Sequence, residues 1–283
     1  MTELDRLREQ GWLLPEQDFS YTLAGNSVPA VRGDGTYPEM GFDVLLAGDV
    51  SGYWFDHRSE RIATALRESG DQTLWDIGAG LGANASRLNE LGFEVLCVEP
   101  DLRATVSMRE NGLVAFAGTL EQMKFPTGSL NAIGLFDVLE HLREPATLLA
   151  EVHRVLAPHG RLLITVPALP ILWSEEDEFA GHELRYTRDK LSRLAFNTGF
   201  REVTSEFLFG SLAIAALMSR TVPYRLGIRR SEAQVRNQML KQLNPSPLVQ
   251  SVLRKILATE SALAKQIRLP FGSSIFATWT KAR

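Results

Sequence analysis

The stretch Leu74-Trp75-Asp76-Ile77-Gly78-Ala79-Gly80-Leu81-Gly82 decides the fold of this 283-residue chain. Its apolar beginning, residues 73–77, predicts a buried parallel strand. Three glycines at alternate positions permit a tight turn in which backbone N–H groups can lie close to a ligand. The helical pattern of residues 83–91 follows, and the positive N-terminal end of that helix would lie at the same turn. This order of strand, glycine turn and helix predicts an α/β domain with a ligand at the turn.

A second apolar run, residues 94–98, predicts the neighbouring strand, and it ends in Glu99-Pro100. In a parallel sheet the Glu99 carboxylate would lie beside the glycine turn. There it could accept hydrogen bonds from both hydroxyls of a ribose. The two strands together predict a site for a cofactor that contains adenosine.

Two such cofactors fit the glycine pattern, and a tight turn without any ligand is the structural alternative. Gly78, Gly80 and Ala83 have the Gly-x-Gly-x-x-Ala spacing of a nicotinamide dinucleotide site. Asp76 followed by Gly78, Gly80 and Gly82 has the pattern of an S-adenosylmethionine site. A carboxylate at position 76 would repel a pyrophosphate and would suit the ammonium group of a methionyl moiety, so Asp76 favours S-adenosylmethionine.

Composition excludes several classes of protein. Hydrophobic residues make up 45% and charged residues 23%, which is ordinary for one large α/β domain with additions or for two small domains. The net charge of −4 argues against a nucleic-acid-binding protein. The single cysteine, Cys97, cannot form an internal disulfide or a cysteine-based zinc site, and we expect no metal. The charged N-terminus lacks an apolar signal core, which favours a cytoplasmic location.

The later strands add candidate residues at their carboxyl ends. Residues 114–117 predict a third strand, and Thr119 and the Leu120 backbone after it would meet an adenine edge or form a plain loop. Residues 131–136 predict a central strand that runs into Phe136-Asp137-Val138-Leu139-Glu140-His141-Leu142. Its acids and histidine are candidates for a general base or an orienting group, with helix capping and a solvated histidine as the alternative.

The segment after the predicted fifth strand, residues 161–166, reaches the same edge of the sheet. It contains a dense polar and aromatic set: Trp173, Asp177, His182, Arg185 and Tyr186. This set predicts an acceptor pocket, in which His182 is the first candidate for a base and Tyr186 or Arg185 for an orienting group.

Taken together, residues 76–166 resemble the class I S-adenosylmethionine-dependent methyltransferases, in the small-molecule group often called type 11 or type 12. The resemblance is carried by the glycine turn with Asp76, by Glu99, by residues 118–121 and by residues 136–142. It implies a Rossmann-like, seven-stranded, mostly parallel sheet with an antiparallel last strand and helices on both faces. In that family the glycine turn surrounds the methionyl part of the cofactor, and an acid at the position of Glu99 holds the ribose. The family often has Asp where this chain has Thr119.

The expected site residues follow from these patterns and from the resemblance. The aromatic segment 52–58 would cover the sheet, or would also close over the cofactor so that Arg58 or His57 meets a ligand carboxylate. The residues expected to bind S-adenosylmethionine are Asp76, Gly78, Ala79, Gly80, Gly82, Glu99, Pro100, Thr119, Leu120, Phe136, Asp137 and Arg58. The residues expected on the acceptor side are His182, His141, Tyr186 and Arg185.

We expect four regions: an irregular N-terminal arm (1–50), a cofactor-binding core (51–210), a helical cap insertion (211–270) and the last strand of the core sheet (271–283). Several segments outside the core motifs resemble a branch of the family that often sits beside glycosyltransferases and lipid-linked pathways: residues 53–58, 172–177, 181–187 and 269–274. The expected acceptor is therefore a small molecule or a glycan- or lipid-linked compound.

Residues 207–230 contain a short apolar run followed by arginines. The run is too short to span a bilayer. A core helix, a homodimer face and an interfacial helix resting on a membrane all fit it. The predicted reaction is O- or C-methylation by in-line displacement at the sulfonium methyl group. The alternatives are an NAD-dependent oxidoreductase and a noncatalytic module that binds S-adenosylmethionine.

Overall fold

The computed structural model describes residues 3–9, 44, 52–264, 267 and 269–281 of the chain. Most of the arm predicted over residues 1–50 therefore lies outside the described residues, although residues 3–9 of it form a helix.

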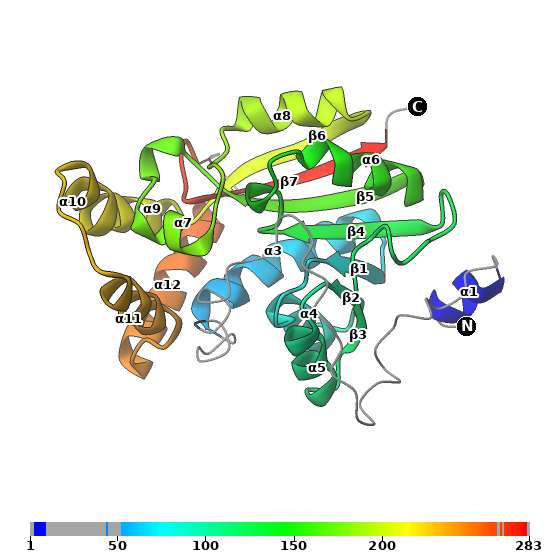
Figure 1. Ribbon diagram of the computed structural model, residues 1–283, viewed down its shortest axis with the longest axis horizontal. Helices are drawn as coiled ribbons and strands as arrows, with labels where there is room; N and C mark the ends of the chain where they lie inside the picture. The colour runs from blue at the N-terminus through cyan, green and yellow to red at the C-terminus, as the bar shows by residue number, and fades with distance from the viewer. Residues whose placement is uncertain (1–2, 10–43, 45–51, 265–266, 268, 282–283) are drawn as a thin grey trace.

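A single seven-stranded sheet crosses the molecule in the order β3-β2-β1-β4-β5-β7-β6 (Figure 1). Its strands are β1 (Thr73–Ile77), β2 (Glu94–Glu99), β3 (Val114–Ala117), β4 (Leu130–Phe136), β5 (Leu156–Pro167), β6 (Phe200–Leu208) and β7 (Ser274–Lys281). Strands β1 to β5 pair in parallel, whereas β7 is antiparallel to both β5 and β6. The predicted class I arrangement with an antiparallel last strand is confirmed.

Helices cover both faces of the sheet (Figure 1). The helices among the described residues are α1 (Glu3–Glu9), α3 (Tyr53–Ser69), α4 (Ala83–Glu90), α5 (Leu102–Glu110), α6 (Pro145–Val155), α7 (Glu175–Ala180), α8 (Arg188–Asn197), α9 (Gly210–Ala216), α10 (Val222–Arg225), α11 (Glu232–Leu243) and α12 (Pro247–Ala264). Short helical turns are η2 (Leu139–His141), η3 (Pro170–Leu172) and η4 (Leu217–Thr221).

Alternation along β1 shows how the sheet separates two apolar cores. Trp75 packs in the core with α6 and α8, whereas Leu74 packs in the core with α3 and α4. Successive side chains of a strand point to opposite faces, so Asp76 lies on the face of Leu74, beneath α3 and α4. A carboxylate therefore occupies a position that pattern alone would assign to an apolar residue.

The parallel strands all end at one edge of the sheet, which we call the rim. The rim carries the glycine turn after β1, Glu99 at the end of β2, Asp137 after β4 and Ala168 after β5. Strand β6 runs parallel to β5 because both are antiparallel to β7. The chain therefore enters α9 and later returns to β7 at the same rim.

The structure differs from the local predictions in two ways. Strand β5 begins at Leu156, not at Arg161, because Leu156 already pairs with Leu130 and the irregularity lies within the strand, where His159 has a φ of 66°. Helices α7 and α11 were not predicted.

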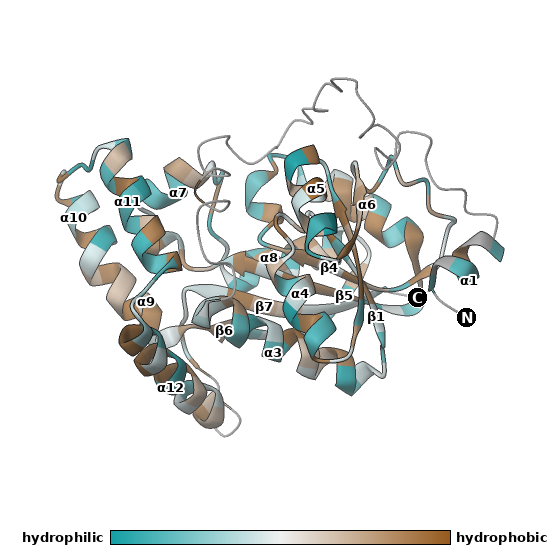
Figure 2. Ribbon diagram, turned by 90° about the horizontal axis from the view of Figure 1, so that it is seen from below, coloured by the Kyte–Doolittle hydropathy of each residue, from teal (hydrophilic) through white to brown (hydrophobic). Residues whose placement is uncertain are grey.

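The helices from α9 to α12, which we call the cap helices (residues 210–264), gather at one end of the molecule (Figure 1). Apolar stretches, brown in Figure 2, lie on α9 and α12. Two of the arginines in residues 207–230 form ion pairs with α7: Arg220 pairs with Glu176, and Arg230 pairs with Glu175 at 2.9 Å. Within the described residues, we find no helix with both the length and the apolar character needed to cross a bilayer.

Candidate functional site

The glycine turn leaves β1 in a conformation that larger residues would strain. Gly78, Gly80 and Gly82 have φ values of 72°, 58° and 74°. A Cβ at Gly78 would lie 2.8 Å from Val138, and one at Gly82 would lie 2.5 Å from Leu113. A Cβ at Gly80 would meet nothing within 4 Å, so space lies open at the middle of the turn. The turn thus packs tightly at both ends and exposes its backbone between them.

Asp76 lies below this turn without a hydrogen-bond partner. Its side chain is almost fully buried, and neither carboxylate oxygen has a partner among the described residues. Burial raises the pKa of Asp76 to about 7, although the nearby charge of Arg58 opposes the shift. An unpaired buried carboxylate is costly, and it is relieved by a cationic or hydrogen-bonding group.

Glu99 completes a pair of acids at the rim. One of its oxygens accepts a hydrogen bond from the Gly80 N–H at 2.8 Å, and the other accepts one from the Asp101 N–H at 2.9 Å. Burial raises the pKa of Glu99 to about 7 against these two hydrogen bonds. Each carboxylate oxygen can accept more than one hydrogen bond, so Glu99 retains capacity for the hydroxyls of a ligand. The two acids are thus adjacent, as the sequence predicted.

Arg58 links the aromatic segment 52–58 to α4 and to the end of β4. Its Nε donates to Asn84 at 3.0 Å, and its terminal NH1 forms an ion pair with Asp137. Thr165 also donates to Asp137, at 3.0 Å. The guanidinium lies 4.1 Å from the centre of the Trp54 ring, a cation–π contact. The structure therefore pairs Arg58, expected to meet a ligand carboxylate, with Asp137 of the protein.

The other residues expected at the cofactor lie near the carboxyl ends of the strands. The Ala79 N–H lies 3.4 Å from the Val98 carbonyl, and Pro100 follows Glu99 at the end of β2. The backbone N–H of Thr119 donates to the Gln122 side chain at 2.8 Å, and Leu120 is buried in the core. Phe136 is buried at the end of β4. All of them lie at or just after the carboxyl ends of β1, β2, β3 and β4, where the sequence placed them.

A second group of polar residues lies at the rim beside β4 and β5. His182 Nδ1 lies 2.8 Å from Asp177, and Arg185 Nε donates to the same carboxylate oxygen at 2.7 Å. Burial opposes ionisation of Asp177, but the His182 hydrogen bond and the Arg185 charge outweigh it and lower the pKa of that carboxyl. The pair therefore holds the His182 ring with Nδ1 toward Asp177 and Nε2 on the other side.

His141 faces His182 across this group. The two ring centres lie 5.0 Å apart with an edge-to-face orientation, and His141 Nδ1 lies 3.4 Å from the Gly181 carbonyl oxygen. Burial, together with the neighbouring His182, lowers the pKa of His141 to about 4, so its ring is neutral at pH 7. The structure thus brings together two histidines from segments that lie about 40 residues apart.

Arg185 and Tyr186 hold the segment that carries His182. Arg185 also donates to the Ala168 carbonyl at 3.1 Å. The Tyr186 hydroxyl is buried and donates to the Leu139 carbonyl at 3.2 Å, and burial raises its pKa. Both side chains therefore contact protein, and their expected role as orienting groups for an acceptor stays a prediction.

Sequence reasoning missed two features of the site. Asn84, the partner of Arg58, lies on the buried side of α4, and its side-chain amide gave no signal beyond a polar residue in a helical pattern. Glu140 was one of several candidate bases, but its side chain is completely buried, which no local pattern indicated.

The comparisons with known proteins agree with this geometry. Residues 75–164 match the family model described as a methyltransferase domain, Methyltransf_11. A probable S-adenosylmethionine-dependent methyltransferase of Mycobacterium tuberculosis strain H37Rv is 23% identical over 194 residues, which cover 67% of this chain and 68% of that protein. An uncharacterized methyltransferase of Mycobacterium bovis is 35% identical over 172 residues, 58% of this chain and 57% of that protein.

Solved structures show the same fold. A Galdieria sulphuraria protein, provisionally described as a sarcosine dimethylglycine methyltransferase, superposes with a TM-score of 0.51 over 80% of this chain and 85% of that chain, at 17% identity. A methyltransferase from Thermotoga maritima gives a TM-score of 0.50 over 81% of this chain and 92% of that chain, also at 17% identity. With its glycine turn and its acids at the rim, the chain contains a methyltransferase domain that matches the Methyltransf_11 family, and its sheet has the fold of the class I S-adenosylmethionine-dependent methyltransferases.

Proposed function

We propose that the rim binds S-adenosylmethionine through two buried acids. Glu99 accepts hydrogen bonds from the ribose hydroxyls, and Asp76 meets the ammonium of the methionyl group. The backbone of Gly78, Ala79 and Gly80 borders the methionyl part, with Gly82 at the start of α4. On the adenine side lie Pro100, Thr119 and Leu120. The unpartnered oxygens of Asp76 support this assignment, because they lack the donor that the cationic cofactor provides. When bound, the cofactor supplies an electrophilic methyl group.

Phe136, Asp137 and Arg58 border the cofactor where β4 ends. Because Arg58 already pairs with Asp137, a ligand carboxylate would bind the remaining N–H groups of the same guanidinium. Arg58 is thus proposed to hold the cofactor and to fix Asp137 at the same time.

The acceptor is proposed to lie on the other side of β4, beside His141 and His182. Asp177 holds Nδ1 of His182, so Nε2 of the same ring takes the proton of an acceptor hydroxyl. General base catalysis of this kind contributes about 10²- to 10⁴-fold, and alignment of the acceptor with the methyl group contributes up to about 7–11 kcal/mol. The proposed reaction is O-methylation, or C-methylation if the acceptor is a carbon acid.

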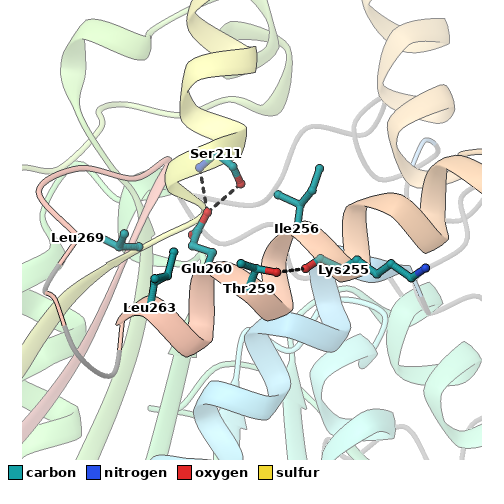
Figure 3. Close-up of a pocket in the computed structure, with 7 residues that line it drawn as sticks. All are labelled: Ser211, Lys255, Ile256, Thr259, Glu260, Leu263 and Leu269. Atoms are coloured by element: carbon teal, nitrogen blue, oxygen red, sulfur yellow. Dashed lines mark hydrogen bonds between the residues drawn. The ribbon is translucent and has the colours of Figure 1, made fainter.

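The cap helices support an acceptor with an apolar part. A pocket of about 440 Å³ lies between α9 and α12, and it is lined by Ser211, Lys255, Ile256, Thr259, Glu260, Leu263 and Leu269 (Figure 3). Within it, Glu260 accepts hydrogen bonds from the Ser211 N–H and hydroxyl. The pocket surface is mainly apolar. A lipid- or glycan-linked acceptor would place its apolar part there.

Peripheral membrane contact through residues 207–230 is part of the same proposal. Met218 is 65% exposed, Leu226 is 73% exposed and Ile228 is 59% exposed. Since Arg220 and Arg230 pair with α7, the contact would depend on apolar side chains more than on a fringe of arginines. Sedimentation with neutral and anionic vesicles tests it. Light scattering tests the alternative that this surface joins two copies of the chain.

Calorimetry with S-adenosylhomocysteine and a screen of lipid- and glycan-linked acceptors test the main proposal. We expect His182→Ala to reduce turnover at least 100-fold while the affinity for S-adenosylhomocysteine stays within twofold. His159→Ala is the matched control, because His159 is exposed near the beginning of β5, away from the rim. Binding of NAD in place of S-adenosylhomocysteine would contradict the cofactor assignment, and unchanged turnover in His182→Ala would contradict the role of His182.

A further inference from the structure

Three side chains on the acceptor side meet the geometric requirement for a metal site. Glu140, His141 and His182 each offer a ligand atom, and these atoms all lie within 4.8 Å of one another. Glu140 and His141 come from η2, directly after β4, and His182 comes from the segment after α7. Backbone contacts tie the two segments together, because the Glu183 N–H donates to the Glu140 carbonyl at 2.7 Å. The three residues are therefore held together by the fold.

The two histidines are oriented as metal-binding histidines usually are. In such sites one ring nitrogen binds the metal, and the other donates to a carboxylate or a backbone carbonyl. Here His182 Nδ1 contacts the Asp177 carboxylate, and His141 Nδ1 contacts the Gly181 carbonyl. Nε2 of each ring is therefore the nitrogen that would bind a metal.

Glu140 provides the negative charge of the group. Its side chain is completely buried, and neither oxygen has a hydrogen-bond partner among the residues that the structure describes. The nearby guanidinium groups pair with other acids, since Arg58 contacts Asp137 and Arg185 contacts Asp177. A buried carboxylate without a partner is strongly unfavourable unless a cation or a proton compensates it. Glu140 thus points independently to a cation at this position.

We propose that Glu140, His141 and His182 bind one divalent transition-metal ion, for which Zn²⁺ is the probe. Two imidazoles and one carboxylate form a donor set suited to zinc and its first-row neighbours, whereas Mg²⁺ and Ca²⁺ prefer oxygen ligands. Around a tetrahedral zinc ion the ligand atoms lie about 3.3 Å apart, so the side chains close inward on binding. This proposal replaces the expectation, drawn from sequence spacing alone, that the chain has no metal site.

Three protein ligands leave a fourth position for another molecule, as in catalytic zinc sites. At the rim that position lies on the acceptor side. In the metal-loaded protein the ion would polarise an acceptor oxygen, and His182 would hold the ion instead of taking a proton. This catalytic part rests on the proposed function, whereas metal binding itself does not.

The test uses full-length protein freed of metal by a chelator and then titrated with Zn²⁺ in a calorimeter. Co²⁺ serves as a second probe, because its visible absorption reports the coordination. We expect one site, bound with micromolar or better affinity. Glu140→Gln and His182→Ala should weaken binding at least 100-fold, with Glu144→Gln and His159→Ala, both exposed, as matched controls. Asp177→Asn should weaken binding about 10- to 100-fold through the orientation of His182.

Zinc binding that is absent in the wild type, or equally strong in Glu140→Gln and in the controls, would overturn the proposal. Circular dichroism and S-adenosylhomocysteine binding of each variant establish that the fold is intact, and the double variant His141→Ala/His182→Ala is used if Glu140→Gln fails to fold. Because no acceptor is present, an error in the proposed methylation leaves this measurement unaffected. Conversely, loss of S-adenosylhomocysteine binding with intact zinc binding would contradict only the proposed cofactor site.

Discussion

Substitution of Asp76 by Asn should change the pH dependence of stability by an amount that follows from burial. Burial raises the pKa of Asp76 from 3.8 to about 7, with Arg58 opposing the shift. A carboxyl whose pKa is raised on folding stabilises the fold fully below its unfolded pKa, and that contribution is lost as pH rises through the folded pKa. At about 1.4 kcal/mol per pKa unit, the ligand-free wild type should lose about 2.6 kcal/mol through Asp76 between pH 5 and pH 8.

The amide side chain of the Asp76→Asn variant carries no charge, so the ligand-free variant should lack this loss. Urea unfolding of both proteins at pH 5 and pH 8 gives the two differences in free energy of unfolding. Glu99 also has a raised pKa, but it is present in both proteins and largely cancels. We therefore expect the difference in free energy of unfolding between wild type and variant to change by about 2–3 kcal/mol between pH 5 and pH 8.

The same substitution, Asp76→Asn, should weaken cofactor binding, although it removes the loss of stability at high pH. The variant loses a charge-assisted interaction with the methionyl ammonium, worth about 1.5–3 kcal/mol, so S-adenosylhomocysteine should bind about 10- to 100-fold more weakly at pH 8. Asp189→Asn, on the exposed first turn of α8, is the control. An identical difference in stability at both pH values would refute the argument from burial, and an unchanged affinity would remove Asp76 from the proposed cofactor site.

Three further substitutions test individual contacts. Gly82→Ala should cost about 1–3 kcal/mol of stability, because φ is 74° and a Cβ would lie 2.5 Å from Leu113; an unchanged urea midpoint would contradict this packing. Tyr186→Phe should cost about 1 kcal/mol by removing the hydrogen bond to Leu139, with cofactor affinity within twofold by calorimetry; a large loss of affinity would instead place Tyr186 at the cofactor. Glu260→Ala should destabilise the start of α9 by about 1–2 kcal/mol, because the carboxylate accepts from two backbone N–H groups there, and unchanged thermal unfolding would contradict that role.

The sequence predicted the cofactor half of the sheet well because its signals are local. Strands β1 and β3 have the predicted bounds, and the Asp76 turn leads directly into α4. Apolar runs bounded by glycine and proline are strong signals for buried parallel strands. The antiparallel β7 was expected from the resemblance, and the pairing of β7 with β5 and β6 confirms it.

The acceptor half was less predictable because its contacts join distant residues. In α7, Glu175 pairs with Arg230 and Glu176 pairs with Arg220. No local sequence pattern predicts ion pairs between residues so far apart in the chain. As a result α7 was missed, and the pairing of these arginines with it was not foreseen. The burial of Glu140 likewise depends on the segment that carries His182, which lies far along the chain. The roles of the individual site residues and the division into four regions stay predictions.

The edge pairing of the last two strands has a consequence for how such a protein can diversify. Leu208 at the end of β6 lies opposite Ser274 at the beginning of β7, so everything between them departs from and returns to neighbouring points. The entropy of closing a loop grows only slowly with its length. An exchange of residues 209–273 for a segment of different size would therefore leave the strand order and the glycine turn at the rim in place. Residues 209–273 can therefore vary in length and sequence as a separate module, while the seven strands keep their order.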